Sequence, residues 1–290
     1  MHSTPQILNM DIKEEIENFK LWLVRLGYAE NTQIGNSRRV NYFLDYIKTN
    51  KISNLNKVTS TTIKNYQNHL DQLPIKSSTI SAYLSSLRLF DKYLQNYGRT
   101  PLITTKLKTI PHTTQTRIIL TQQEITQLYK ATDQSVIGFR DRAILSIYYG
   151  CGLRATEGRN LIIQDIDFKS NLLQVRKSKT HQPRYVPMNK NVQEYLKEWL
   201  EYGRIIALTT QSNYVLVHSK GQYKDATGFN NRLKKLQEQS NITKQISLHG
   251  LRHSIATHLL ENGMKLEQIM QFLGHHSLEV TQRYTHLVYG

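Results

Sequence analysis

Residues 247–286 of this chain read SLHGLRHSIATHLLENGMKLEQIMQFLGHHSLEVTQRYTH, and this stretch decides the fold class. Its apolar residues recur at intervals of three and four, which is the spacing of one face of an α-helix. The pattern predicts one helix that ends at Gly263, a second that ends at Gly274, and a third that begins after Ser277. Consecutive short helices of this kind indicate a mainly α-helical domain.

The polar residues of the stretch have a register of their own. His249 and Arg252 are three apart, so they share a helix face that is distinct from the apolar stripe. His275 follows the glycine that ends the second helix, and Tyr284 comes nine residues later. A guanidinium group, two imidazoles and a phenol can therefore meet around a single anion.

These residues carry a resemblance to a known family. HGLRH followed by LGHHSLEVTQRYTH resembles the second signature block of the tyrosine recombinases, the integrase family that includes the Xer-like site-specific recombinases. The pattern of that block is His-x-x-Arg, then Leu-Gly-His, then a tyrosine nine residues after that histidine. Several residue types at fixed long spacings make this a specific signal.

The segment LRATEGRNL, at residues 153–161, resembles the first signature block of the family, in which an acid follows an arginine by three residues. Arg154 and Glu157 lie one helical turn apart, so we expect the carboxylate to orient the guanidinium group. Alone, such a pair is more typical of a surface ion pair of little energetic value. Beside the C-terminal block, we interpret it as a catalytic arginine with a supporting acid. Gly158 departs from the pattern, because the family often has a larger apolar residue there, and this leaves the local packing open.

A small sheet is expected next. Strand-like runs at 166–168, 172–175 and 185–186 are separated by turns, and they predict three antiparallel strands. The segment RYVP, at residues 184–187, resembles the Arg-x-Val-Pro strand of the family. Alignment on that strand places the hairpin lysine of the family at Lys179, with Lys177 as the rival assignment. The later run 215–219 is short and apolar, and we expect it to be buried.

The chain before the first block predicts four amphipathic helices, which suit a four-helix bundle. Gly27, Pro74 and Gly98 are the expected stops of three of them. The resemblance implies that residues 8–98 form the core-binding (SAM-like) DNA-binding domain of the family. Residues 99–117 contain no acid and read as a linker, and residues 118–290 form the catalytic domain. The expected fold class is mainly α, with a small three-stranded antiparallel sheet in the second domain.

The composition favours a polyanionic partner. Lysine plus arginine outnumber aspartate plus glutamate by 38 to 22, for a net charge of +16 and a pI near 9.8. This excess favours nucleic acid before an anionic membrane. No apolar run of about 18 residues is present, so the sequence predicts no membrane span, and no signal peptide is visible. Cys151 is the sole cysteine, which excludes an internal disulfide and suits a reducing cytoplasm.

The residue types fit chemistry at a phosphodiester. Attack on phosphorus adds negative charge to the non-bridging oxygens, and the planar, permanently charged forks of Arg154 and Arg252 match those oxygens. His249 and His275 can donate hydrogen bonds to the same group or move a proton near neutral pH. The resemblance implies that Tyr284 is the nucleophile.

The resemblance also implies that Lys179 protonates the departing 5′ oxygen, and that a 3′-phosphotyrosyl intermediate conserves the bond energy. We therefore expect no requirement for ATP, metal or another cofactor. A two-metal nuclease needs clustered carboxylates, whereas Glu157 is the acid near these residues. A zinc site built from the histidines would press Arg252 against a cation and leave Tyr284 unexplained, so no metal site is predicted.

Six further basic residues are expected to contact DNA, on the first domain, the linker and the hairpin: Arg88, Lys106, Lys108, Arg176, Lys177 and Arg184. A helix over 230–239 is expected to point Arg232, Lys234 and Lys235 outward.

The predicted function is site-specific recombination of duplex DNA, for integration or excision of a mobile element or for dimer resolution. A type IB topoisomerase and a non-enzymatic basic DNA-binding protein are the alternatives. The resemblance implies a homotetramer, or a hetero-tetramer with a paralogue, on two DNA sites, with accessory directionality proteins as further partners. Only six residues follow Tyr284, whereas many relatives continue into a C-terminal helix. Either the subunits interlock through another surface, or the chain is trimmed.

Overall fold

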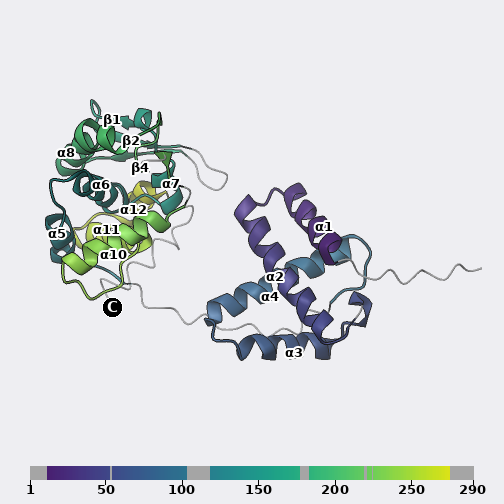
Figure 1. The fold of residues 1–290 in the computed structure, drawn as a ribbon. Helices are drawn as coiled ribbons and strands as arrows, with labels where there is room; N and C mark the ends of the chain where they lie inside the picture. Colours follow the sequence, from purple (N-terminus) through teal and green to yellow (C-terminus); the bar gives the residue numbers. More distant parts are fainter. Residues whose placement is uncertain are drawn as a thin grey trace, which may run out of the picture. The chain divides into compact units, whose positions relative to one another are not determined.

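A computed structural model describes residues 12–52, 54–102, 118–176, 183–218, 221–223 and 225–274. The chain divides into two compact units, Met1–Gln115 and Thr116–Gly290, and each is described by itself (Figure 1). Within those ranges, no helix combines the length and the apolar character that a bilayer span requires.

The first unit is helical, as its apolar periodicity predicts. Gly27 and Gly98 adopt positive φ angles of 75° and 65° just after the first and last helices, where a left-handed residue ends a helix. Thr59 caps the third helix, because its hydroxyl accepts a hydrogen bond from the amide of Thr62. The elements are α1 (Ile12–Arg25), α2 (Glu30–Thr49), the short turn η1 (Leu55–Lys57), α3 (Ser60–Asp71) and α4 (Ser77–Asn96).

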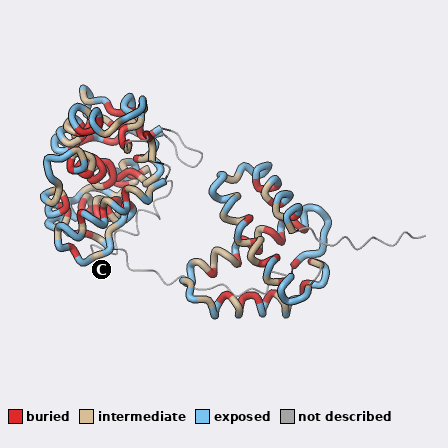
Figure 2. The backbone as a smooth tube through the Cα atoms, viewed as in Figure 1, coloured by how far each residue is buried: buried red, intermediate tan, exposed pale blue. Residues whose placement is uncertain are grey.

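Buried residues recur along the helices of this unit (Figure 2), and aromatic side chains form much of its core. Phe19 of α1 and Phe90 of α4 are fully buried, and their rings meet edge to face with centroids 5.2 Å apart. Each such side chain contributes about 1.5–3 kcal/mol by leaving water. Arg99 follows α4 and donates 2.6 Å hydrogen bonds to the buried carboxylate of Glu15 on α1, which ties the ends of the unit together.

The second unit is mostly helical, and its sheet has the predicted topology. The three antiparallel strands lie in the order β1-β2-β3, with Leu173 opposite Val186. The strands are β1 (Ile166–Asp167), β2 (Leu172–Val175) and β3 (Arg184–Pro187). The helices are α5 (Gln122–Lys130), α6 (Val136–Leu145), η3 (Ser146–Gly150), α7 (Ala155–Arg159), η4 (Ile163–Asp165), α8 (Lys190–Glu198), η5 (Trp199–Gly203), α9 (Arg204–Ala207), α10 (Thr227–Gln239), α11 (Leu248–Glu261) and α12 (Leu266–Leu273). The mainly α fold class is therefore confirmed.

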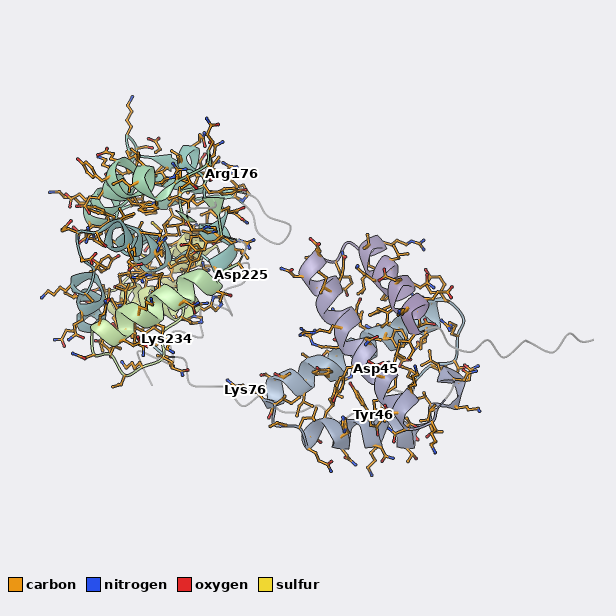
Figure 3. The ribbon with its side chains drawn as sticks, in the orientation of Figure 1. Asp45, Tyr46, Lys76, Arg176, Asp225 and Lys234 are labelled. Atoms are coloured by element: carbon orange, nitrogen blue, oxygen red, sulfur yellow. The ribbon has the colours of Figure 1, made fainter. Side chains whose placement is uncertain are left out.

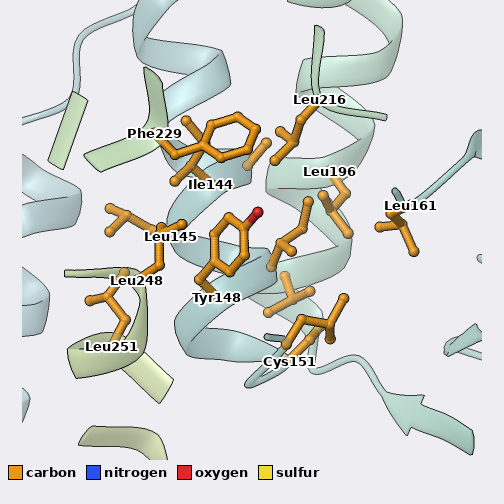
Figure 4. Close-up of a cluster of buried hydrophobic side chains, with 14 of the residues drawn as sticks. Ile144, Leu145, Tyr148, Cys151, Leu161, Leu196, Leu216, Phe229, Leu248 and Leu251 are labelled. Carbon is orange, nitrogen blue, oxygen red and sulfur yellow. The ribbon is translucent and has the colours of Figure 1, made fainter. Parts of the chain in front are cut away.

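The apolar core of this unit gathers around η3 (Figure 4). Tyr148 is fully buried, and its hydroxyl donates to the carbonyl of Ala155. Trp199 is also fully buried and donates 2.8 Å from its indole nitrogen to the carbonyl of Val215, so it belongs to the core. Burial raises the pKa of Cys151 to about 12, which leaves a protonated, unreactive thiol.

Helix α6 begins at Val136 and passes into the π-helical turn η3. Two details differ from the sequence-based expectation. Residues 215–217 of the apolar run are buried as expected, whereas His218 is half-buried and Ser219 lies outside the described ranges. The run also forms β4 (Val217–His218), which pairs with β5 (Gly221–Gln222). Arg232 does not point outward. It forms an ion pair with the buried carboxylate of Asp141 on α6, whereas Lys234 and Lys235 are exposed.

The start of the second unit is fastened to α11. The amide of Leu120 donates 2.9 Å to the Ser254 hydroxyl, and Nε2 of His258 lies 2.8 Å from the Leu120 carbonyl oxygen. The Tyr149 hydroxyl lies 2.9 Å from Nδ1 of the same histidine. Burial lowers the pKa of His258, so the neutral ring is favoured in this setting.

Candidate active site

The described residues include three of the predicted catalytic residues and the predicted supporting acid. Arg154 and Glu157 lie at the start of α7, and His249 and Arg252 lie on the first turns of α11. Six other predicted site residues lie outside the described ranges: Lys106, Lys108, Lys177, Lys179, His275 and Tyr284.

The first arginine and its acid make the contact that their spacing predicts. Glu157 accepts 2.8 Å from the backbone amide of Arg154 with one carboxylate oxygen, and 2.9 Å from the Arg154 guanidinium group with the other. The carboxylate thus caps α7 and fixes the direction of the guanidinium group at once. Its side chain is only 6% exposed, so this is not the solvated surface pair that the spacing alone would allow.

The second arginine, Arg252 on α11, also lies beside Glu157, although it follows that residue by almost one hundred positions. Arg252 is buried, and it donates 2.5 Å to the carbonyl of Gly152 and 2.6 Å to the carbonyl of Leu273. Its guanidinium nitrogen lies 3.8 Å from a carboxylate oxygen of Glu157. Gly152, with φ 59°, lets the chain turn between η3 and α7 so that its carbonyl meets Arg252.

Both arginines converge on the C-terminal end of α12. Arg154 donates to the carbonyls of Leu273, at 3.3 Å, and Gly274, at 2.8 Å, and Arg252 shares the first of these. The last carbonyls of a helix have no partner within the helix and carry its negative partial charge, so cations are stabilising there. Gly274 ends α12 in the left-handed conformation, and His275 is the next residue in the sequence.

A third arginine of the cluster was expected elsewhere. Arg184, predicted as a DNA contact, has a side chain that is 9% exposed. It donates 3.0 and 2.9 Å to the two carboxylate oxygens of Glu157, and 3.0 Å from Nε to the carbonyl of Phe272. The structure therefore places it inside the arginine cluster. No local pattern in the sequence relates Arg184 to Glu157, because the two residues are 27 positions apart and meet only in the tertiary fold.

The positive charges of the cluster lower the pKa of its acid, Glu157. Burial alone would raise the pKa of Glu157, but the hydrogen bonds and charge of Arg184, and then those of Arg154, outweigh burial and lower this pKa to about 2. The acid is ionised at neutral pH. It therefore cannot act as a proton donor there, and its role in this arrangement is to hold guanidinium groups.

The other described site residues are more open. His249 is exposed on α11, with its ring centroid 5.2 Å from that of His253. Arg176 lies at the end of β2 (Figure 3). Its side chain is 52% exposed and donates 2.7 Å to the buried carboxylate of Asp165. Arg88 is half-buried on α4. Within the described ranges, no three His, Cys, Asp or Glu side chains gather into a potential metal site.

A cleft of about 350 Å³ borders this cluster. Its lining includes Thr156, Glu157, Asn160, Gln174 and Arg176, so it runs from α7 to the strand that leads into the hairpin.

Residues 119–290 match the phage integrase family, and residues 16–98 match the N-terminal SAM-like domain of phage integrases. The chain belongs to the phage integrase family. It is 31% identical over 256 residues to tyrosine recombinase XerC of Oceanobacillus iheyensis, covering 84% of this chain and 82% of that one. It is 31% identical over 280 residues to tyrosine recombinase XerD of Listeria monocytogenes, covering 94% and 93%. The resemblance to Xer-like tyrosine recombinases is thus confirmed.

The fold agrees with solved structures of the family. The crystal structure of the XerH site-specific recombinase bound to its difH substrate, before cleavage, superimposes with a TM-score of 0.74. The two sequences are 17% identical, and the match covers 98% of this chain and 88% of that one. At that identity the likeness concerns the fold.

Proposed function

We propose that this tyrosine recombinase cuts and rejoins duplex DNA at specific sites through a 3′-phosphotyrosyl intermediate on Tyr284. Members of the family are DNA strand-transferring enzymes, and the topoisomerase and non-enzymatic alternatives are not favoured. The observation that carries the proposal is the convergence of Arg154 and Arg252 on the end of α12, immediately before His275.

The two arginines are the proposed phosphate grip. Besides Glu157, which binds Arg154, the acceptors of the two arginines include the neutral carbonyls of Leu273 and Gly274. A phosphate oxygen forms stronger hydrogen bonds with a guanidinium group than a neutral carbonyl does. Glu157 holds one of the forks in a fixed direction before DNA arrives. A charge that is oriented in advance stabilises the transition state most, because it needs no reorganisation during the reaction.

The proposed proton transfers involve two histidines and one lysine. The Tyr284 oxygen forms a bond to phosphorus as the bond from phosphorus to the 5′ oxygen breaks. His249 and His275 hydrogen-bond the phosphoryl group, and one of the two imidazoles accepts the single proton of the Tyr284 phenol, whose free pKa is about 10. Lys179 gives a proton to the departing 5′ oxygen. Attack by the 5′ hydroxyl of a partner strand reverses these steps and releases the tyrosine. The proposed cycle therefore requires neither ATP nor a metal ion.

Duplex DNA is the proposed partner, and the net charge of +16 supports a polyanion. The XerH structure is described as bound to a difH substrate. We assign the SAM-like unit, residues 8–98, and the basic segment 99–117 to DNA binding, and residues 118–290 to catalysis. The active assembly is proposed to be a homotetramer, or a hetero-tetramer with a paralogue, on two sites, with directionality proteins as accessory factors. The proposed phosphate contacts are Arg88, Lys106, Lys108, Arg176 and Lys177.

A nicked suicide duplex tests the proposal. Cleavage near the nick releases a short strand and traps the covalent protein–DNA adduct, so the wild type should accumulate adduct and Tyr284→Phe should not. Tyr202→Phe is the matched control, because Tyr202 is 59% exposed on η5 and lies outside the proposed site. Equal trapping by Tyr284→Phe would show that the nucleophile is misassigned. EDTA should not reduce the yield, and exchange of strands between two labelled duplexes separates recombination from nicking and closing.

A further inference from the structure

The side chain of Arg184 is largely buried, whereas a residue that contacts DNA has its charged group at the surface. It opens β3, yet its guanidinium group turns inward and bridges two parts of the second unit. Two of its nitrogens bind the two oxygens of Glu157 at 3.0 and 2.9 Å, and its Nε binds the carbonyl of Phe272 at 3.0 Å. With 9% of its side chain exposed, little of the group is open to a phosphate.

The end of α12 depends on this bridge together with the other two arginines. Arg184 takes the carbonyl of Phe272, Arg252 and Arg154 share that of Leu273, and Arg154 takes that of Gly274. Among the described residues, three guanidinium groups thus satisfy three consecutive carbonyls that the helix itself leaves without partners. The position where the chain continues into His275 is set by these contacts.

We infer that Arg184 is a positioning residue for strand transfer. It fixes the positions of Glu157 and of the C-terminal end of α12 relative to Arg154 and Arg252. This inference rests on the proposed function of that site. A fork is required, because a single ammonium group cannot span both carboxylate oxygens and a carbonyl in a fixed plane. A loss of register of about 1 Å at a reacting centre can cost on the order of 100-fold in rate.

The packing around Gly274 supports the same role. A Cβ added at Gly274 would lie 2.8 to 3.0 Å from three atoms of the Arg184 side chain. The arginine therefore packs directly against the turn that ends α12, in addition to its hydrogen bonds there. Contact with the acid, with the helix and with the turn that follows it makes Arg184 the link among the three.

The test compares Arg184→Gln with Arg232→Gln in the full chain. Arg232 is a matched control, because it also donates two hydrogen bonds to one buried carboxylate, that of Asp141, and its side chain is 18% exposed. Adduct formation on the suicide duplex is measured at saturating DNA, and binding is measured separately as a function of salt. We expect Arg184→Gln to lower the adduct-forming rate about 100-fold, with the dissociation constant changed by less than about threefold. Arg232→Gln should retain the wild-type rate per folded molecule.

A double variant and a structural readout sharpen the test. Because Arg184 acts through Glu157, the pair Arg184→Gln and Glu157→Gln together should be no more than about threefold slower than the slower single variant. The amide of Gly274, which donates 3.1 Å to the carbonyl of Gln271, should exchange with solvent faster in Arg184→Gln than in Arg232→Gln. If Arg184→Gln does not fold, Arg184→Lys replaces it, with a smaller rate loss expected and DNA affinity retained.

Two results would overturn the inference. A weaker affinity with an unchanged rate at saturation, and a salt slope reduced by about 0.9, would make Arg184 a phosphate contact. Equal rates for the wild type, Arg184→Gln and Arg232→Gln, with unchanged exchange at Gly274, would leave only a structural ion pair. Both results are distinct from failure of the proposed function, which is seen when Tyr284→Phe traps as much adduct as the wild type.

Discussion

Replacing Glu157 with glutamine removes a carboxylate that all three arginines of the cluster contact. The pKa of this acid is lowered from 4.5 to about 2 in the folded chain. Since a tenfold change in proton affinity corresponds to about 1.4 kcal/mol, the ionised form stabilises the fold by about 3 kcal/mol at pH 7. A lowered pKa means that this contribution is complete above pH 4.5 and is lost as the pH falls towards 2. At pH 3.5 about 2 kcal/mol remains.

The difference in unfolding free energy between the wild type and Glu157→Gln should therefore narrow by about 1 kcal/mol between pH 7 and pH 3.5. Urea unfolding followed by tryptophan fluorescence measures it. A Trp22→Phe background leaves Trp199 as the sole tryptophan, so the signal reports on the second unit. Glu194→Gln is the control, because Glu194 is exposed on α8, and it should change stability by less than about 0.5 kcal/mol. A difference that is equal at both pH values would refute the reasoning, since the acid would then not be ionised by its arginines.

Three further predictions concern the support of the site. Gly158→Ala should destabilise the second unit by about 1–3 kcal/mol in urea unfolding, because its Cβ would lie 2.7 Å from the ring of Tyr148; an unchanged midpoint would contradict this. Trp199→Phe should cost about 1–3 kcal/mol, because the buried carbonyl of Val215 loses its donor, and a thermal melt that matches the wild type would count against it. His258 has a lowered pKa, so wild-type stability should fall as the pH drops below 6.5, and His258→Gln should flatten that pH dependence; identical slopes would argue against this.

The sequence predicts the architecture well, because apolar periodicity and the residues that end helices and strands are local signals. The apolar stripes and their glycine stops locate the helices of the first unit, and the short apolar runs separated by turns locate the three-stranded sheet. Thr121 and Glu124 form a reciprocal cap at α5, which their three-residue spacing favours. The departure at Gly158 is now explained, because the ring of Tyr148 fills the space that a larger side chain would need.

What could not be predicted involves partners that are distant in the sequence. Arg184 and Glu157 are 27 residues apart, and Arg232 and Asp141 are 91 apart, so no periodicity relates them. A lysine or arginine on a strand or helix needs an anionic partner. The sequence does not reveal whether that partner is a DNA phosphate or a buried carboxylate. That distinction depends on which surface the tertiary fold covers. The assignments of the nucleophile and the hairpin lysine remain predictions, because those residues lie outside the described ranges.

The uneven charge count of the arginine cluster has a consequence for handling the protein. Arg154, Arg184 and Arg252 carry three positive charges and Glu157 one negative charge, which leaves a formal +2 in a site that is largely shielded from water. Mutual repulsion of the guanidinium groups opposes folding until a multivalent oxyanion shares the space. Sulfate or inorganic phosphate should therefore raise the melting temperature of the second unit more than chloride does at equal ionic strength, as a ligand of the native state must.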